Sequence, residues 1–204
     1  MALKSIRSIL TISFIAMLCL TLIPTGNVRA LTGQFNGVDL PALDTFVEKV
    51  KNGQADELRG VYIPNVLAAP VIQQPAGMYG FVSSWQNIMT QFSLASKLGS
   101  TGLLAHDNLV GKSFAVLQNG QEFHLIYGDG QISTFVVSEI LQFQALEPTS
   151  ISSSFVDLES GDILTTSELF MKIYDRPGQV ILQTCINADN NASWGRLFII
   201  AKPG

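Results

Sequence analysis

Short apolar runs separated by Gly, Pro and Asn make up most of the chain from Gly60 onward. Runs of this length with such boundaries predict β-strands. Asn119-Gly120 lies between two of the runs and is the strongest hairpin signal in the sequence. The expected strands are 61–63, 71–72, 103–104, 114–117, 122–127, 134–145, 180–186 and 197–201. About eight strands predict a mostly β fold, an antiparallel sheet closed into a small barrel.

Two or three short helices accompany these strands. Asp39 and Pro41 supply an N-cap and a first-turn proline, after which Leu43, Phe46, Val47 and Val50 repeat with helical spacing and Gly53 ends the pattern. Further helices are expected at 91–98 and at 166–173. We therefore expect an N-terminal segment at 1–30, a helix and linker at 31–59, and one domain at 60–204.

The first 30 residues have the features of an export signal. Lys4 and Arg7 precede an uncharged, largely apolar run from Ser8 to Pro24, and Val28-Arg29-Ala30 places small residues where a signal peptidase cleaves. The run is short for a membrane-spanning helix, so a secretory signal is favoured over an uncleaved membrane anchor. The small residues expected before a lipoprotein cysteine are missing at Cys19. We expect an exported protein, secreted or attached to the cell envelope.

Composition narrows the possible classes of function. The chain has 204 residues with 12 Lys+Arg and 16 Asp+Glu, and residues 31–204 carry 9 basic and 16 acidic groups, a formal charge of −7. An acidic chain with scattered basic residues lacks the basic surface of a nucleic-acid binder. The apolar fraction is too high for a disordered tail. This charge is also ordinary for solubility, so it gives little support to an interaction protein acting through an acidic surface.

Cleavage after Ala30 would leave Cys185 as the only thiol. Without a partner in the chain it is a packed core residue, an intermolecular disulfide partner or a reactive group. The strand that carries it, Val180–Ile186, is followed by a polar loop and by a second strand containing Arg196. Antiparallel pairing would place Cys185 and Arg196 opposite each other on one face. A cation beside a thiol favours the thiolate.

Two histidines are available as a base. His124 lies inside an expected strand, where an exposed or half-buried structural role is the simpler interpretation. His106 follows the apolar run Gly102–Ala105 and precedes Asp107-Asn108, so it lies where a strand meets a loop. Side chains at such positions can reach a substrate. Asp107 and Asn108 are its neighbours in sequence, which alone does not make them its partners.

The segment Ile181-Leu182-Gln183-Thr184-Cys185 resembles the Thr-Leu-x-Thr-Cys strand of sortases, which are exported cysteine transpeptidases. An upstream His after a short apolar strand and an Arg on the strand after the Cys follow the same order as in that family. Gly60–Pro64 with Ala69-Pro70-Val71 is similar to the opening strands of sortases, and Gly111–Phe114 to the strand after the His. The resemblance covers residues 60–202 and implies a closed sortase-like β-barrel of about eight strands.

The sequence also departs from the family pattern. Ile181 stands at the first Thr of the motif, and Ala105 replaces the Gly that usually precedes the His. The spacing between His106 and Cys185 exceeds that of the shorter members, and residues 161–178 hold much of the excess. The equivalent loop helps sortases to choose a substrate, so the resemblance leaves the recognised peptide open.

The resemblance implies a role for each matched residue. Cys185 would attack a peptide carbonyl and form a thioester, His106 would transfer protons, and Arg196 would bind the substrate or its oxyanion. Thr184 would position the thiol or contact the substrate. The partners implied are a peptide or protein with a sorting-type motif and an accepting amine or water. No cofactor is implied, and one Cys with two distant His residues does not form a zinc site.

Two other families of cysteine enzymes fit the sequence less well, and one alternative of a different class remains. An L,D-transpeptidase would carry His and Gly directly before the Cys, where Gln183 and Thr184 stand. A papain-like peptidase would place the Cys ahead of the His. The alternative of a different class is an exported binding module on a sortase-like barrel, with Cys185 as an inert core thiol. The chemistry must be argued from the site, because a fold alone does not establish an activity.

Overall fold

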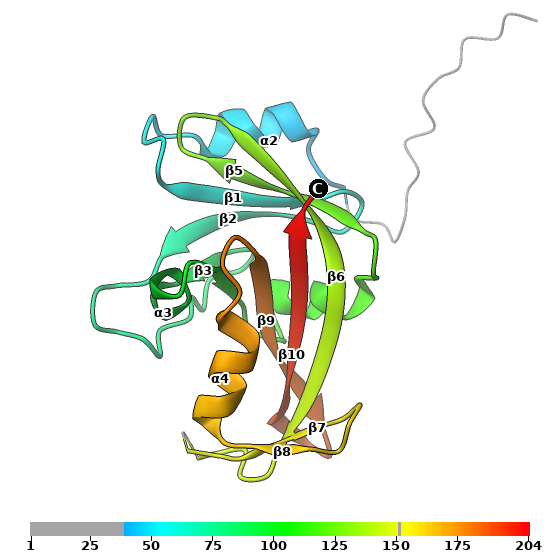
Figure 1. The fold of residues 1–204 in the computed structure, drawn as a ribbon. Coiled ribbons are helices and arrows are strands. Elements are labelled where there is room, and N and C mark those ends of the chain that lie inside the picture. Colours follow the sequence, from blue (N-terminus) through cyan, green and yellow to red (C-terminus); the bar gives the residue numbers. More distant parts are fainter. Residues whose placement is uncertain (1–38, 151) are drawn as a thin grey trace, which may run out of the picture. The chain divides into compact units, whose positions relative to one another are not determined.

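The computed structural model describes residues 39–150 and 152–204, which form a closed β-barrel with short helices (Figure 1). Eight strands form the ring, in the order β10, β9, β4, β3, β2, β1, β5 and β6, and β6 pairs back with β10. The ring strands are β1 (Leu58–Ile63), β2 (Leu67–Gln73), β3 (Met89–Phe92), β4 (Thr101–Leu104), β5 (Glu122–Tyr127), β6 (Ile132–Ala145), β9 (Val180–Ala188) and β10 (Asn191–Pro203). The predicted mostly β barrel of about eight strands is confirmed.

Most neighbouring strands in the ring are antiparallel. The exceptions are β2 with β3 and β4 with β9, which run parallel. Two further strands, β7 (Phe155–Asp157) and β8 (Ile163–Leu164), extend the sheet beyond β6. Closure leaves β6 and β10 paired over most of their length, from Gly195 with Gln144 to Pro203 with Phe135.

Apolar side chains line both faces of the wall formed by β9 and β10. One set, including Val180, Leu182 and Ile199, fills the barrel interior. The alternate set, including Ile181 and Phe198, packs outside the barrel against α4 (Thr166–Tyr174). Figure 1 shows α4 beside β9 and β10. The outer face of these strands is therefore partly covered, and the helix forms a wall beside any site on it.

The helices follow from local sequence signals. In α4, the Thr165 side chain accepts from the Glu168 N–H and the Glu168 carboxylate accepts from the Thr165 N–H, which is a capping box. Helix α2 (Leu43–Val50) packs Phe46, Val47 and Val50 against the barrel. Ala42 occupies its N-cap without a side-chain hydrogen bond, so the predicted Asp39 cap is wrong.

The predicted strand at 114–117 is wrong, because Val110–Val116 forms a 3-10 helix, η1. Gly111, Phe114 and Leu117 are buried while Ala115 and Val116 are exposed, which is a period of three and not of two. The hairpin expected at Asn119-Gly120 is wrong for the same reason: this turn joins η1 to β5. The resemblance of Gly111–Phe114 to a sortase strand also fails.

The sequence did not predict β3, β7 and β8. Residues 91–98, expected as one helix, divide into the end of β3 and the five-residue helix α3 (Ser93–Lys97). The expected export segment at 1–30 and the start of the expected 31–59 region lie outside the described residues. None of the helices in residues 39–150 and 152–204 is long and apolar enough to cross a membrane.

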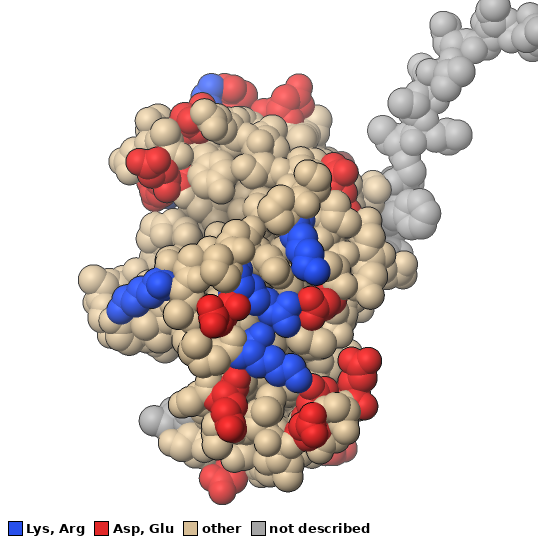
Figure 2. Space-filling view, viewed as in Figure 1, with Lys and Arg blue, Asp and Glu red and all other residues tan. Residues whose placement is uncertain are grey.

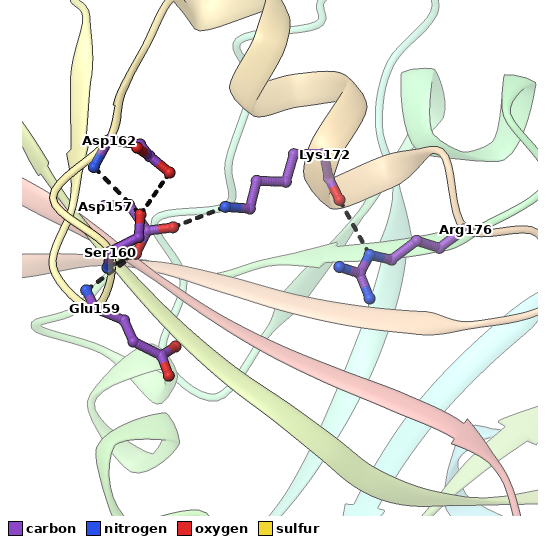
Figure 3. Close-up of polar contacts among 6 residues, drawn as sticks. All are labelled: Asp157, Glu159, Ser160, Asp162, Lys172 and Arg176. Carbon is purple, nitrogen blue, oxygen red and sulfur yellow. Dashed lines mark hydrogen bonds and ion pairs between the residues drawn. The ribbon is translucent and has the colours of Figure 1, made fainter.

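Two ion pairs attach α4 and the segment after it to the sheet. Lys172 Nζ lies 2.7 Å from Asp157 Oδ2 on β7, and Arg176 Nη1 lies 2.7 Å from Glu139 Oε1 on β6. Asp157 also accepts from the Glu159 N–H, in the tight turn that follows β7 (Figure 3). Figure 2 shows acidic side chains beside the basic ones on this face of the molecule.

Asp157 provides a pH-dependent test of this attachment. Burial raises the pKa of Asp157, but hydrogen bonds from Lys172 and from the Glu159 and Ser160 N–H groups outweigh it, so the pKa is lower than usual. A lowered folded-state pKa stabilises the fold above the unfolded-state pKa, and this stabilisation is lost as pH falls through the folded-state value. We expect Lys172→Met to lower the free energy of unfolding at pH 7 by about 1–3 kcal/mol.

Urea unfolding at pH 7 and at pH 3 measures this difference. The decrease in the free energy of unfolding caused by Lys172→Met should be smaller at pH 3 than at pH 7. Protonation of Asp157 removes the negative charge with which Lys172 pairs. Lys51→Met is the matched control, because it breaks the exposed Lys51–Glu48 pair and should cost less than about 0.5 kcal/mol. An equal loss for Lys172→Met at both pH values would contradict the assignment.

Candidate active site

Cys185 and Arg196 face each other across the β9–β10 pair, as the sequence predicted. They are direct partners in the antiparallel register. Their neighbours two residues away, Gln183 and Phe198, are paired in the same way. Since Ile181 and Phe198 belong to the cluster outside the barrel, strand alternation puts Cys185 and Arg196 on the outer face too.

His106 lies at the end of β4, on the other side of β9. The parallel register pairs Leu104 with Gln183, and the Ala105 N–H continues it by donating to the Gln183 carbonyl at 3.1 Å. The paired register ends at Leu104, and His106 lies two residues past it, in the loop that follows β4. A Cβ on Gly102 would meet Ala95 and Tyr174 outside the barrel, so the alternate residue His106 is on the outer face. The register pairs Cys185 with Arg196, and the bond from the Ala105 N–H to the Gln183 carbonyl brings the segment that leads into His106 alongside β9.

Arg196 is half-buried and keeps donors available. Its Nη1 donates to the carbonyls of Ser193 at 3.2 Å and Gly195 at 2.8 Å, and its Cζ lies 5.9 Å from the Phe155 ring centroid. Among the described residues, no carboxylate pairs with this guanidinium, and its Nε and Nη2 have no partner. Arginine donors held in place in this way suit a substrate carbonyl or a developing oxyanion.

A tight turn fixes the backbone of His106. Its carbonyl accepts from the N–H groups of Leu109 at 3.1 Å and Gly111 at 3.0 Å. A Cβ on Gly111 would lie 2.4 Å from Thr184 Oγ1 and 2.5 Å from the His106 oxygen, so only glycine fits between the two. Gly111 therefore packs directly against both the segment after β4 and the strand that carries the thiol. Within the described part of the chain, neither Asp107 nor Asn108 bonds the His106 ring.

Thr184 faces the barrel interior, on the other side of β9 from Gln183. Its side chain is 4% exposed, and its Oγ1 is buried without a hydrogen-bond partner in the described structure. Thr184 lines a pocket of about 360 Å³ at one end of the barrel, together with Asp107, Lys112, Cys185 and Asn187. A buried hydroxyl without a hydrogen-bond partner is costly, and this one lies on the opposite face of β9 from the Cys185 side chain.

The thiol of Cys185 is half-buried, and its surroundings favour the neutral form. Burial raises the pKa of Cys185, the Arg196 charge lowers it and the Asp107 charge raises it, and the net pKa is higher than usual. The predicted effect of Arg196 therefore has the right sign but is outweighed. A thiol in this state needs a base to remove its proton before it attacks a substrate.

The sequence missed the contributions of Asp107 and Gly111. Asp107 was named only as a neighbour of His106, yet it lines the pocket with Cys185 and acts on the thiol. The sequence signal that could have identified Asp107 was its place directly after His106, where an expected strand meets a loop. Gly111 carried no signal, because its requirement arises from a close approach between Thr184 and His106.

Two other features include none of His106, Cys185 and Arg196, although Lys112 lines both pockets. His124 is on β5, where its Nδ1 lies 3.1 Å from Thr134 Oγ1 and its ring stacks on Tyr62, as its structural interpretation predicted. A larger pocket of about 730 Å³ is lined by residues of α2, β2 and η1 and contains none of His106, Cys185 and Arg196.

No protein-family model matches the sequence, and no curated protein is significantly similar to it. Solved structures similar to this chain include sortase C-1 of Actinomyces oris, at 14% identity and a TM-score of 0.49, over 81% of this chain and 82% of that one. Sortase C1 of Streptococcus suis has 17% identity and a TM-score of 0.49, over 78% of this chain and 76% of that one. Sortase C1 of Streptococcus agalactiae, in complex with MTSET, has 18% identity and a TM-score of 0.46, over 74% of this chain and 69% of that one. All three of these similar structures are sortases, and their identities to this chain are 14% to 18%.

The opposing charges around Cys185 predict opposite effects of two substitutions. Asp107→Asn removes a negative charge near the thiol and should lower its pKa, whereas Arg196→Ala should raise it. The midpoint of the pH–rate profile for alkylation by iodoacetamide, followed by intact mass, measures both shifts. A Cys19→Ser background leaves Cys185 as the only thiol.

Asp56→Asn is the matched control, because Asp56 is exposed and distant in sequence from the site. It should leave the alkylation midpoint unchanged. The charge assignment is wrong if Asp107→Asn and Arg196→Ala move the midpoint in the same direction, or if neither moves it.

Proposed function

We propose that the protein is a sortase-type cysteine transpeptidase or hydrolase of exported proteins. What supports this proposal is the direct pairing of Cys185 with Arg196 across β9 and β10, together with the Ala105–Gln183 bond, which brings the segment before His106 alongside β9. Nucleophilic catalysis by a thiol requires a base and a stabiliser of negative charge in these positions.

In the first half of the reaction, His106 takes the proton of the Cys185 thiol, and the sulfur attacks the carbonyl carbon of a peptide bond. The carbonyl oxygen becomes negatively charged and accepts hydrogen bonds from Arg196. The carbon–nitrogen bond then breaks, and His106 gives its proton to the departing amine. The acyl group remains on Cys185 as a thioester.

In the second half, an amine or water attacks the thioester carbonyl and gives a proton to His106. The carbon–sulfur bond breaks, and the sulfur recovers the proton from His106. An amine yields a new peptide bond and water yields a carboxylic acid. In this proposal Thr184 contacts the substrate through the pocket that it lines with Cys185, because its own side chain faces the barrel interior.

The partners follow from this chemistry. The acyl donor is a peptide or protein with a sorting-type motif, and the acceptor is an amine or water. The export signal expected at residues 1–30 would direct the chain to the extracellular or cell-envelope side, secreted or held at the membrane by an uncleaved N-terminus. The reaction described here uses no cofactor.

The thioester can be tested without knowing the natural substrate. The full chain would be incubated with a randomised pentapeptide-amide library and hydroxylamine as the acceptor, and peptide hydroxamates would be measured by mass spectrometry. We expect wild type to form hydroxamates and Cys185→Ala to form none. His106→Ala should be slower by about 10²–10⁴-fold, and Arg196→Ala by about 10²–10³-fold.

His124→Gln is the matched control, because it removes the other histidine and should retain the wild-type rate. Hydroxamates that form equally with Cys185→Ala would mean that another group, or a contaminant, does the chemistry. If folded wild type forms none from the library, the proposal fails. A non-catalytic binding module, with Cys185 as a packed thiol, would then be the better account.

A further inference from the structure

Gln183 lies on the outer face of β9, two residues before Cys185. Residues two apart on a strand point to the same face and are about 6.6 Å apart. The paired neighbours of Gln183 are Leu104 on β4 and Phe198 on β10, both of which are buried. The half-buried amide of Gln183 is therefore a polar group in an apolar surround, next to the thiol and on its face.

A buried tyrosine fixes the orientation of this amide. The Tyr174 hydroxyl, at the end of α4, donates to Gln183 Oε1. Tyr174 is 3% exposed and is held among the aromatic rings of Phe92, Phe170 and Phe198. Its carbonyl accepts from Ser100 Oγ at 2.8 Å, which further fixes its backbone. Because the Tyr174 hydroxyl bonds Oε1, the Gln183 NH₂ group points away from that hydroxyl.

The Gln183 NH₂ group is a donor without a partner. Within residues 39–150 and 152–204, Nε2 makes no hydrogen bond, and it is absent from the buried unpartnered atoms, which are Gln179 Oε1 and Thr184 Oγ1. The Nε2 atom therefore keeps some exposed surface. Half-buried Phe92 and Phe170 lie beside Tyr174, so an entering side chain would meet an apolar wall and this one donor.

We propose that Gln183 determines specificity by donating a hydrogen bond to an acceptor on a side chain of the peptide substrate. This inference rests on the proposed function, since it concerns the peptide bound to Cys185. The spacing from Gln183 to Cys185 equals about two residues of extended peptide, so the recognised side chain is within two residues of the scissile carbonyl. Asn and Gln provide such an acceptor, whereas Leu of similar size leaves Nε2 unpaired.

Matched peptides provide the test. The randomised library first identifies a pentapeptide that wild type converts to a hydroxamate. Versions with Asn or Leu at each position within two residues of the scissile bond are then compared with the full chain, using kcat/KM. We expect wild type to prefer Asn about tenfold or more at one of these positions.

Three variants assign the preference to the amide. Gln183→Leu should reduce the Asn-to-Leu ratio to about one while retaining activity on the Leu peptide. Gln183→Glu keeps an acceptor for Tyr174 but replaces the donor, so it should disfavour Asp and favour Lys at the same position. Tyr174→Phe should reduce the ratio, because the amide loses its fixed orientation. Gln131→Leu, in the exposed β5–β6 turn, should keep the wild-type ratio.

The outcomes separate this inference from the proposed function. Hydroxamate formation with no Asn preference at any tested position overturns the inference and leaves the proposed function standing. A fall in kcat/KM of equal size for the Asn and Leu peptides in Gln183→Leu also overturns it, because Gln183 would then contact the peptide backbone. If wild type forms no hydroxamate from any peptide, both proposals fail.

Discussion

The register of β4, β9 and β10 is the constraint on which the site depends. A slip of one residue along β9 would turn Cys185 into the barrel and Thr184 outward, because side chains alternate between faces. Apolar residues on both faces of β9 oppose such a slip: Leu182 packs inside the barrel and Ile181 packs outside. The two-residue turn at Asp189-Asn190, with φ of 51° and 59°, joins β9 to β10 and fixes their register at the turn end of the hairpin.

Helix α4 adds a second layer to this arrangement. It covers part of the outer face, is attached through the Lys172–Asp157 pair, and bonds β9 directly through Tyr174 and Gln183. The Cys185 thiol on the same face is half-buried. Burial therefore raises the pKa of Cys185, and the neighbouring guanidinium only partly offsets the effect. In this environment the role of His106 as a base becomes necessary for the proposed chemistry.

Much of the barrel could be predicted from the sequence, because long strands such as β6 and β9 carry strong local patterns. The pairing of Cys185 with Arg196 could also be anticipated, since a hairpin joins adjacent segments. The 3-10 helix η1 could not, because short apolar runs do not distinguish a period of two from a period of three. The Tyr174–Gln183 bond and the close contact of Gly111 with Thr184 depend on tertiary packing, and β7 and β8 are too short to give a pattern.

The central claim is that Cys185 is accessible in the folded protein and belongs to a reactive site. Native-state alkylation by iodoacetamide, over a range of reagent concentrations in the Cys19→Ser chain, tests it most directly. The account predicts a labelling rate that rises in proportion to reagent concentration and falls when His106 is replaced by Ala. A rate that is independent of reagent concentration and equal to the rate of unfolding would identify Cys185 as a packed core thiol and contradict the account.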